Sequence, residues 1–118
     1  MSLVKVIPKI FYADIKEGLN LFVEGLGFKV TYQDDYLKII ERDGVTLQLV
    51  ADEEYAKKDR PEIRIVTDDI QALYNEVKEK NTGLLHPNLN VIKRQPWGLT
   101  EFALRDASDV CVIIQQND

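Results

Sequence analysis

The sequence predicts an α+β fold in which two tandem β-α-β-β-β modules form an incomplete barrel with a central cleft. The main observation is a repeated order of elements, because a strand, a helix and three further strands occur in residues 4–52 and again in residues 61–117. A shift of 55 positions aligns the copies and places Asp14 on Asp69, each directly before a helical pattern. One helix leaves a face of its sheet uncovered, so the two open faces are expected to enclose the cleft.

The composition sets the class of protein. A chain of 118 residues with 45% hydrophobic and 30% charged residues is expected to form one globular domain, residues 1–118. The net charge of -5 and the absence of a basic run argue against nucleic acid and favour a cationic or neutral small ligand. The single Cys111 excludes an internal disulfide and fits a reducing compartment. Since no run of about 18 apolar residues occurs, we expect a cytoplasmic protein without a membrane partner.

The first module begins with an expected strand over residues 4–12, where Pro8 indicates an edge or a bend because proline cannot donate to a ladder. Asp14 is predicted to cap a helix, with Glu17 three residues on completing a capping box. The helix is expected to end at the glycines of residues 25–27. Its predicted buried stripe consists of Ile15, Leu19, Phe22 and Leu26.

Three short strands complete the first module, and the Asp43-Gly44 pair between the last two is a strong hairpin signal. The expected strands are Phe28–Tyr32, Tyr36–Glu41 and Val45–Val50. Residues 53–60 then break the apolar pattern with a run of charges. They are predicted to be a solvated linker that has room for one helical turn.

The second module repeats the order. A strand over residues 62–67 precedes a helix that Asp68-Asp69 caps, and residues 81–83 end that helix. Its buried residues are expected to be Ile70, Leu73 and Val77. Irregular strand material follows in residues 84–93, where Pro87 interrupts it. The module closes with a predicted hairpin made of Thr100–Arg105 and Val110–Gln115.

Alternation along the strands predicts which side chains face the helices and which face the cleft. Residues such as Ile10, Leu47 and Ile65 are expected to pack on the helices. The cleft side of the first, fourth, fifth and eighth strands is predicted to carry Ile7, Lys9, Phe11, Thr46, Gln48, Val50, Glu62, Arg64, Val66, Cys111, Ile113 and Gln115.

The chain resembles the vicinal-oxygen-chelate superfamily, which contains glyoxalase I, extradiol dioxygenases, fosfomycin-resistance enzymes and bleomycin-resistance proteins. The resemblance covers residues 4–117 and is closest to the small bleomycin-resistance-like proteins. It is carried by Asp14, Leu26-Gly-Phe28, Val66-Thr-Asp-Asp-Ile70, and Trp97-Gly98 through Phe102 to Arg105-Asp106. Asp106-Ala-Ser-Asp109 stands where an Asp-Pro-Asp-Gly turn is usual. The resemblance implies a homodimer with clefts between the subunits, often with an exchanged first strand.

The resemblance also permits a test for a metal site. Metal-using members place a ligand on the first, fourth, fifth and eighth strands, and these positions correspond here to Ile7, Gln48, Glu62 and Ile113. The two isoleucines have no donor atom, and one carboxylate with one amide oxygen would hold a divalent ion weakly. His86 lies outside these positions and fits an ordinary loop histidine. We therefore expect no metal and no other cofactor.

Other catalytic chemistry has little support in the sequence. Cys111 lies in an apolar strand without a histidine spaced to activate it, which favours a buried and inert thiol. Glu62 and Arg64 share one strand face and are expected to form an ion pair more readily than a catalytic pair. If the chain is an enzyme, Glu62 is its predicted base, with a metal at Gln48 as possible help.

The remaining candidates are aromatic and polar side chains at the predicted cleft. The only tryptophan, Trp97, lies in a Pro-Trp-Gly turn, where its ring can either form a pocket wall or anchor the loop. The predicted ligand-binding residues are Trp97, Phe11, Tyr36, Gln48, Glu62, Arg64, Phe102 and Ile113. They suit a flat ring system with cationic or amide substituents. The alternative is that these side chains fill the cleft themselves or are covered at a dimer interface.

Three functional hypotheses follow. The first is a metal-independent, antibiotic-like small-molecule binding protein of the bleomycin-resistance type, which acts by sequestration without chemistry. The second is an enzyme of the glyoxalase/dioxygenase superfamily with an altered or partial metal site and Glu62 as base. The third is an interaction module without a small ligand. One fold hosts many activities, so the side chains of the site have to decide between them.

Overall fold

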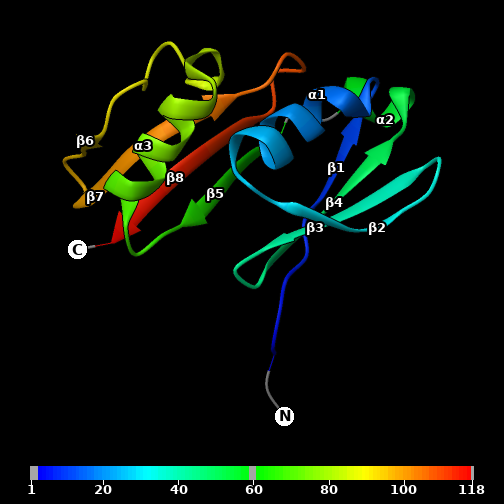
Figure 1. The fold of residues 1–118 in the computed structure, drawn as a ribbon, viewed down its shortest axis with the longest axis horizontal. Helices are drawn as coiled ribbons and strands as arrows, with labels where there is room; N and C mark the ends of the chain where they lie inside the picture. The colour runs from blue at the N-terminus through cyan, green and yellow to red at the C-terminus, as the bar shows by residue number, and fades with distance from the viewer. Residues whose placement is uncertain (1–2, 59–60, 118) are drawn as a thin grey trace.

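The computed structural model describes residues 3–58 and 61–117, which form two four-stranded sheets (Figure 1). One sheet has the strand order β1-β4-β3-β2 and the other β5-β8-β7-β6. In each sheet the first strand of the module pairs in parallel with the last, and the other pairs are antiparallel. The two sheets do not close into a barrel. This topology confirms the two β-α-β-β-β modules predicted from the repeat.

The elements of the first module are β1 (Lys9–Tyr12), α1 (Ile15–Leu19), the π-helix η1 (Asn20–Gly25), β2 (Lys29–Gln33), β3 (Leu37–Arg42) and β4 (Val45–Ala51). Helix α2 (Glu53–Lys58) occupies most of the predicted linker, whose residues 59 and 60 lie outside the described residues. The elements of the second module are β5 (Glu62–Val66), α3 (Ile70–Lys80), the short 3₁₀ helix η2 (Thr82–Leu84), β6 (Lys93–Arg94), β7 (Leu99–Arg105) and β8 (Cys111–Asn117).

The first strand is shorter than the predicted strand over residues 4–12. Pairing with β4 begins at Lys9, and the carbonyl oxygen of Pro8 accepts the last contact, from the backbone N–H of Gln48 at 3.0 Å. Residues 3–7 form no strand and extend away from the body of the molecule (Figure 1). Because the ring nitrogen of Pro8 has no hydrogen to donate, the ladder ends at the bend that the sequence indicated.

The first helix departs from an ideal α-helix. Asp14 caps it as predicted and accepts a hydrogen bond from the backbone N–H of Lys16 at 3.1 Å. The reciprocal bond of the capping box is missing among the described residues, and Glu17 Oε2 is buried without a partner. After α1 the chain widens into η1, in which Leu26 donates to the carbonyl of Leu21 five residues back. This wider turn shifts the buried stripe, so Leu21 joins the core although the sequence did not predict it.

The two modules share one hydrophobic core, which lies between the helices and the helix-facing sides of both sheets. It combines residues of η1 and α3 with residues of β1, β3, β4, β7 and β8, and the half-buried Ile63 and Ile65 of β5 pack against it. Helix α1 lies so close to β1 that a Cβ atom on Gly18 would come within 2.5 Å of the Tyr12 ring. Phe102 on β7 is fully buried and meets the Tyr74 ring edge-on, with 5.0 Å between centroids. None of the helices in the described ranges is long and apolar enough to cross a membrane.

A buried hydrogen bond joins the two modules. The hydroxyl of Tyr12 on β1 donates to Asp106 Oδ2 at 2.5 Å, and Asp106 lies in the turn between β7 and β8. Asp106 Oδ1 accepts from the backbone N–H groups of Ser108 and Val110 at 2.9 and 3.0 Å. Burial raises the pKa of the Asp106 carboxyl above its ordinary value, although these donors oppose the rise, and burial raises the pKa of Tyr12 as well. Asp106 therefore holds together the turn that departs from the usual Asp-Pro-Asp-Gly.

This carboxyl is expected to give the stability a distinct pH dependence. The raised pKa means that the folded chain binds the proton of Asp106 more tightly than the unfolded chain does. Its contribution is therefore fully present below the ordinary pKa of 3.8 and is lost as the pH rises through the folded value. Urea unfolding between pH 3.5 and 7 should show the wild type losing stability relative to Asp106→Asn, which does not titrate. A constant difference between the two proteins would contradict the raised pKa.

Candidate functional site

Each sheet packs one face on the helices of the shared core, which are α1 and η1 for the first sheet and α3 for the second. On β1 and β4 the residues Ile10, Leu47 and Leu49 are buried in the core, which puts the alternate residues on the other side, as the sequence predicted. We call the opposite sides of the two sheets the first and the second open face, although α2 covers part of the first, where its Tyr55 stacks on Phe11. The first includes Lys9, Phe11, Ile39, Thr46, Gln48 and Val50, and the second includes Glu62, Arg64, Lys93, Glu101, Ala103, Arg105, Cys111, Ile113 and Gln115.

The positions that hold a metal in metal-using relatives are divided between the two open faces. Gln48 lies on β4 and Ile7 just before β1, whereas Glu62 and Ile113 lie on β5 and β8 of the other sheet. Ile113 is 93% buried, since its exposed fraction is 7%. Within residues 3–58 and 61–117, no group of three His, Cys, Asp or Glu side chains is placed to hold a metal ion. The donor set does not fit a metal, and the expected absence of one stays a prediction.

Three accessible aromatic side chains lie on or beside the first open face: Phe11 and Tyr32 are on it, and Tyr36 lies at its edge, opposite Ala51. Phe11 is half-buried and stacks on Tyr55 of α2, with 5.1 Å between ring centroids. Tyr36 is exposed in the bend before β3, where Asp34 Oδ1 accepts from its backbone N–H at 2.8 Å. Tyr32 on β2 is also exposed and donates to Asp34 Oδ2 at 2.8 Å. Ring faces of this kind offer stacking surface to a flat ligand.

On the second open face, Arg64 has a different partner from the one predicted. Its Nη1 donates to Glu101 Oε2 at 2.5 Å and to Gln115 Oε1 at 3.1 Å. Glu62, the partner expected from the sequence, makes no ion pair among the described residues. Glu101 is 2% exposed, so a buried carboxylate two strands away competes more effectively than an exposed neighbour on the same strand. The sequence did carry a signal that could have identified Glu101 as a residue of this face. Alternation along β7 places residues 101, 103 and 105 on the same side of the sheet.

Trp97 and Phe102 were both predicted to contact a ligand, but they differ in exposure. Trp97 lies at the tip of the turn between β6 and β7 and is 63% exposed. Gly98 there has a φ of 91° and donates to the carbonyl of Gln95 at 3.0 Å, which matches a three-residue hairpin loop with glycine in the left-handed region. Phe102, by contrast, alternates onto the helix side of β7 and is fully buried. The prediction that Phe102 contacts a ligand was wrong, because neighbouring strand residues face opposite sides.

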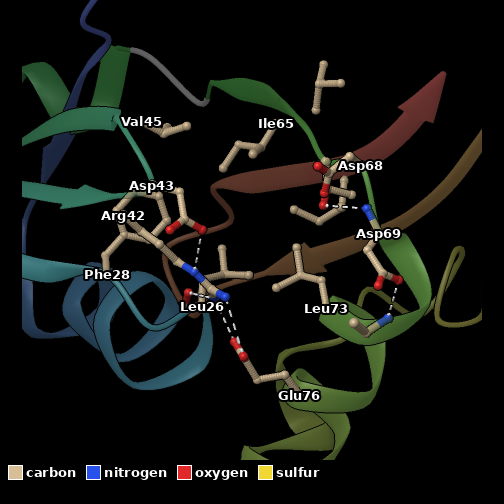
Figure 2. A pocket seen from close by; sticks show the side chains of 14 residues that line it. Leu26, Phe28, Arg42, Asp43, Val45, Ile65, Asp68, Asp69, Leu73 and Glu76 are labelled. Carbon is tan, nitrogen blue, oxygen red and sulfur yellow. Dashed lines mark hydrogen bonds and ion pairs between the residues drawn. The ribbon is translucent and has the colours of Figure 1, made fainter.

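A cavity between the two modules lies away from the open faces. It has a volume of about 620 Å³ and lies between the β3–β4 hairpin of one module and β5 and α3 of the other (Figure 2). Its floor is apolar and its rim carries several carboxylates. The floor includes Leu26, Phe28, Val45, Ile65 and Leu73, and the rim includes Asp43, Asp68, Asp69 and Glu76. None of the predicted ligand-binding residues lines it.

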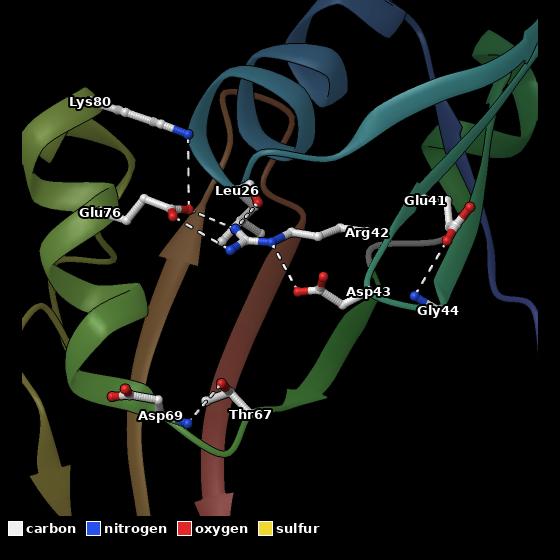
Figure 3. Close-up of polar contacts among 9 residues, drawn as sticks. All are labelled: Leu26, Glu41, Arg42, Asp43, Gly44, Thr67, Asp69, Glu76 and Lys80. Atoms are coloured by element: carbon white, nitrogen blue, oxygen red, sulfur yellow. Dashed lines mark hydrogen bonds and ion pairs between the residues drawn. The ribbon is translucent and has the colours of Figure 1, made fainter.

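An ion pair between the modules closes one end of this groove (Figure 3). Arg42 at the end of β3 donates through Nη1 to Glu76 of α3 and to the carbonyl of Leu26, each at 2.6 Å. Glu76 is the main cause of a raised pKa at Arg42. The groove exists because the shared core and this pair fix the modules against each other while the β3–β4 hairpin stays clear of β5. The predicted cleft between the open faces stays a prediction.

The remaining polar candidates show no catalytic arrangement. Burial raises the pKa of the half-buried Cys111 thiol, and the nearby Glu62 adds to the rise. A raised pKa keeps the thiol protonated, so it is a poor nucleophile at neutral pH. His86 accepts a hydrogen bond at Nδ1 from the backbone N–H of Asn88 at 3.1 Å, as expected for a histidine that shapes a loop.

Comparison of the coordinates with solved structures identifies the fold, although the sequence matches no family model and no curated protein. The bleomycin-binding protein of the bleomycin producer Streptomyces verticillus, complexed with copper(II)-bleomycin, is similar with a TM-score of 0.79 at 21% identity, covering 100% of this chain and 99% of that one. The bleomycin resistance determinant encoded on transposon Tn5 gives 0.78 at 21% identity, covering 98% and 99%.

A third similar structure is a glyoxalase/bleomycin resistance protein/dioxygenase from Alicyclobacillus acidocaldarius. It has a TM-score of 0.77 at 18% identity and covers 95% of this chain and 89% of that chain. All three likenesses extend over nearly the whole of both chains, so they include both modules and the connection between them. At these identities they establish the architecture and leave the ligand open. The chain has the fold seen in these bleomycin-binding and bleomycin-resistance proteins.

Proposed function

We propose that this chain is a metal-independent small-molecule binding protein of the bleomycin-resistance type, which acts by sequestration. The observation that carries the proposal is the chemistry of the open faces. They present aromatic rings and amide groups at their surface but hydrocarbon at two of the four positions where relatives bind a metal. The fold shared with bleomycin-binding proteins supports the same activity class. Sequestration requires only affinity, because binding lowers the free concentration of a toxic molecule without any chemical step.

The proposed ligand is a flat, partly aromatic molecule. Trp97 and Tyr36 are exposed, and each can stack on a ring while keeping its own polar atom in water. Gln48 is half-buried on the first open face and offers an amide for a hydrogen bond. These side chains lie on different sheets of one subunit, so the full site is proposed to form between two subunits of a homodimer.

Binding is tested by calorimetry with metal-free bleomycin and, in parallel, with copper-loaded bleomycin. We expect stoichiometric binding that is unchanged when the protein is first stripped with EDTA. The Trp97→Ala variant should bind about tenfold more weakly, as for other exposed aromatic anchors at binding sites. Lys16→Met, on the helix side, is the matched control and should bind like the wild type. Binding that disappears after EDTA and returns with a divalent cation would overturn the metal-independent proposal.

The enzymatic alternative makes a separate prediction. Glu62 lies on the second open face beside Cys111, and it is accessible to a substrate. If it were the base, Glu62→Gln would abolish turnover of a bound substrate while leaving the fold intact. Under the binding proposal, the same variant leaves bound bleomycin chemically unchanged, as the wild type does. Mass spectrometry of the recovered ligand distinguishes the two hypotheses, since only an enzyme alters the mass.

The proposed dimer gives a prediction about the exposed segment at residues 3–7. Leu3, Val4 and Val6 are almost fully exposed in one subunit, which is unfavourable for three apolar side chains. Burying each in a dimer contributes about 1.5 to 3 kcal/mol. Replacing all three by serine should therefore raise the dimer dissociation constant at least about 100-fold in light scattering or sedimentation. Val91→Ser, at an exposed valine of a loop, should leave it unchanged. A wild type that stays monomeric at 100 µM would contradict the dimer.

A further inference from the structure

The second open face has a feature that bears on the charge of the ligand. Arg64 lies on β5 and its ion-pair partner Glu101 lies on β7, with β8 between them in the sheet. The side chain of Arg64 must therefore run across β8 to reach Glu101. It also meets Gln115 of β8 on the way. This places the guanidinium group over β8 on the second open face, near Ile113, the neighbour of Arg64 in the ladder.

The cost of this arrangement indicates that it has a role. Glu101 is 2% exposed, and removing a carboxylate from water is unfavourable unless its partner compensates. An apolar residue would stabilise the sheet at least as well as a buried ion pair does. What the pair provides is a fixed position for Arg64, because two acceptors hold the same nitrogen, Nη1. A guanidinium held in this way loses little further freedom when it binds a ligand.

The rest of the guanidinium remains available. All of the hydrogen bonds of Arg64 within the described residues pass through Nη1, and 43% of its side chain is exposed. The donors on Nη2 and Nε are thus free to bind a planar pair of oxygen atoms. Arg105 and Lys93 lie on the same open face as Arg64. This face therefore carries three cationic side chains and two carboxylates, those of Glu62 and Glu101. The local charge is positive although the chain as a whole carries -5.

We propose that Arg64, held by Glu101 and Gln115, recognises an anionic substituent on the ligand, such as a carboxylate, phosphonate or sulfonate group. The proposal rests on the proposed small-molecule binding function and adds a subsite that favours aromatic ligands with an anionic substituent over those without one. It also revises the expectation of a cationic ligand, which came from net charge alone. Charges within a few ångströms dominate over distant ones, because solvent and salt screen the latter. The exposed part of the guanidinium itself can stack on the ring of the ligand.

Two dyes with the same ring skeleton test the inference. 1-Anilinonaphthalene-8-sulfonate carries a sulfonate, and N-phenyl-1-naphthylamine does not. We expect the wild type to bind the sulfonate dye at least fivefold more tightly in fluorescence titrations. Arg64→Met should lower the affinity for the sulfonate dye about tenfold, because the paired hydrogen bonds from the guanidinium to the sulfonate are lost. The affinity for the neutral dye should stay within twofold of the wild-type value. Arg64→Lys should fall between, since an ammonium lacks the planar fork. The charge-matched control Lys16→Met, on the helix side, should leave both affinities unchanged.

Arg64→Met leaves Glu101 buried without its partner and can reduce folding. The double variant Arg64→Met/Glu101→Leu removes both charges, and it should stay folded and show the same loss for the sulfonate dye. Equal affinity of the wild type for both dyes, or an Arg64→Met variant that keeps the preference, would overturn the inference while leaving the binding function intact. If neither dye binds, the inference and the proposed aromatic binding site both fail.

Discussion

Phe102→Ala is expected to lower the free energy of unfolding by about 3 to 5 kcal/mol, the range for removing a large aromatic side chain from a packed core. Phe102 has no exposed surface, belongs to the core shared by the two modules, and contacts the Tyr74 ring edge-on. Alanine would leave a cavity that the strands of a hydrogen-bonded sheet cannot collapse to fill. Urea unfolding followed by circular dichroism measures the loss directly.

The matched control is Trp97→Ala, at an aromatic residue of the same hairpin that is 63% exposed. It should cost less than about 1 kcal/mol, because little buried contact is lost. Ligand binding should show the reverse order, with a loss in the Trp97 variant and an unchanged affinity in Phe102→Leu, which remains folded. A mild effect of Phe102→Ala on stability would mean that this side chain is not part of the core.

Asp106→Ala is expected to destabilise the chain by about 3 to 4 kcal/mol, since it removes three hydrogen bonds from a buried site at once. The hydroxyl of Tyr12 loses the acceptor that it has among the described residues, and the backbone N–H groups of Ser108 and Val110 lose theirs. The hydroxyl of Tyr12 is on β1 of the first module, so the substitution affects the junction of the modules as well as the β7–β8 turn. The unfolding midpoint in urea is the readout.

Two further variants separate these contributions. Tyr12→Phe removes only the contact between the modules and should cost about 2 kcal/mol, less than Asp106→Ala. Asp109→Asn changes an exposed acid in the same turn, and asparagine tolerates the positive φ of 64° at that position. It should lie within about 0.5 kcal/mol of the wild type. Equal losses for Asp106→Ala and Asp109→Asn would show that the buried hydrogen bonds add nothing.

The candidate site was only partly accessible from the sequence. Alternation placed Arg64 and Ile113 on the same side of the second sheet, because the period of two is a local property of any strand. The same rule applied to β7 would have placed Glu101 on that side and Phe102 on the other. The sequence could not select Glu101 as the partner of Arg64, since the choice depends on which strands become neighbours.

The two modules, the order of elements along each, the helix caps at Asp14 and Asp69, and the side of each sheet that the helices cover could all be predicted from the sequence. These features follow from local periodicity and capping chemistry, which act over a few residues. Only the tertiary structure decided the π turn, the Tyr12–Asp106 link, the groove at Arg42 and Glu76, and the ion pair of Arg64 with Glu101. Each of these depends on how segments separated by tens of residues pack, and packing energy resides in side-chain contacts that no local pattern encodes.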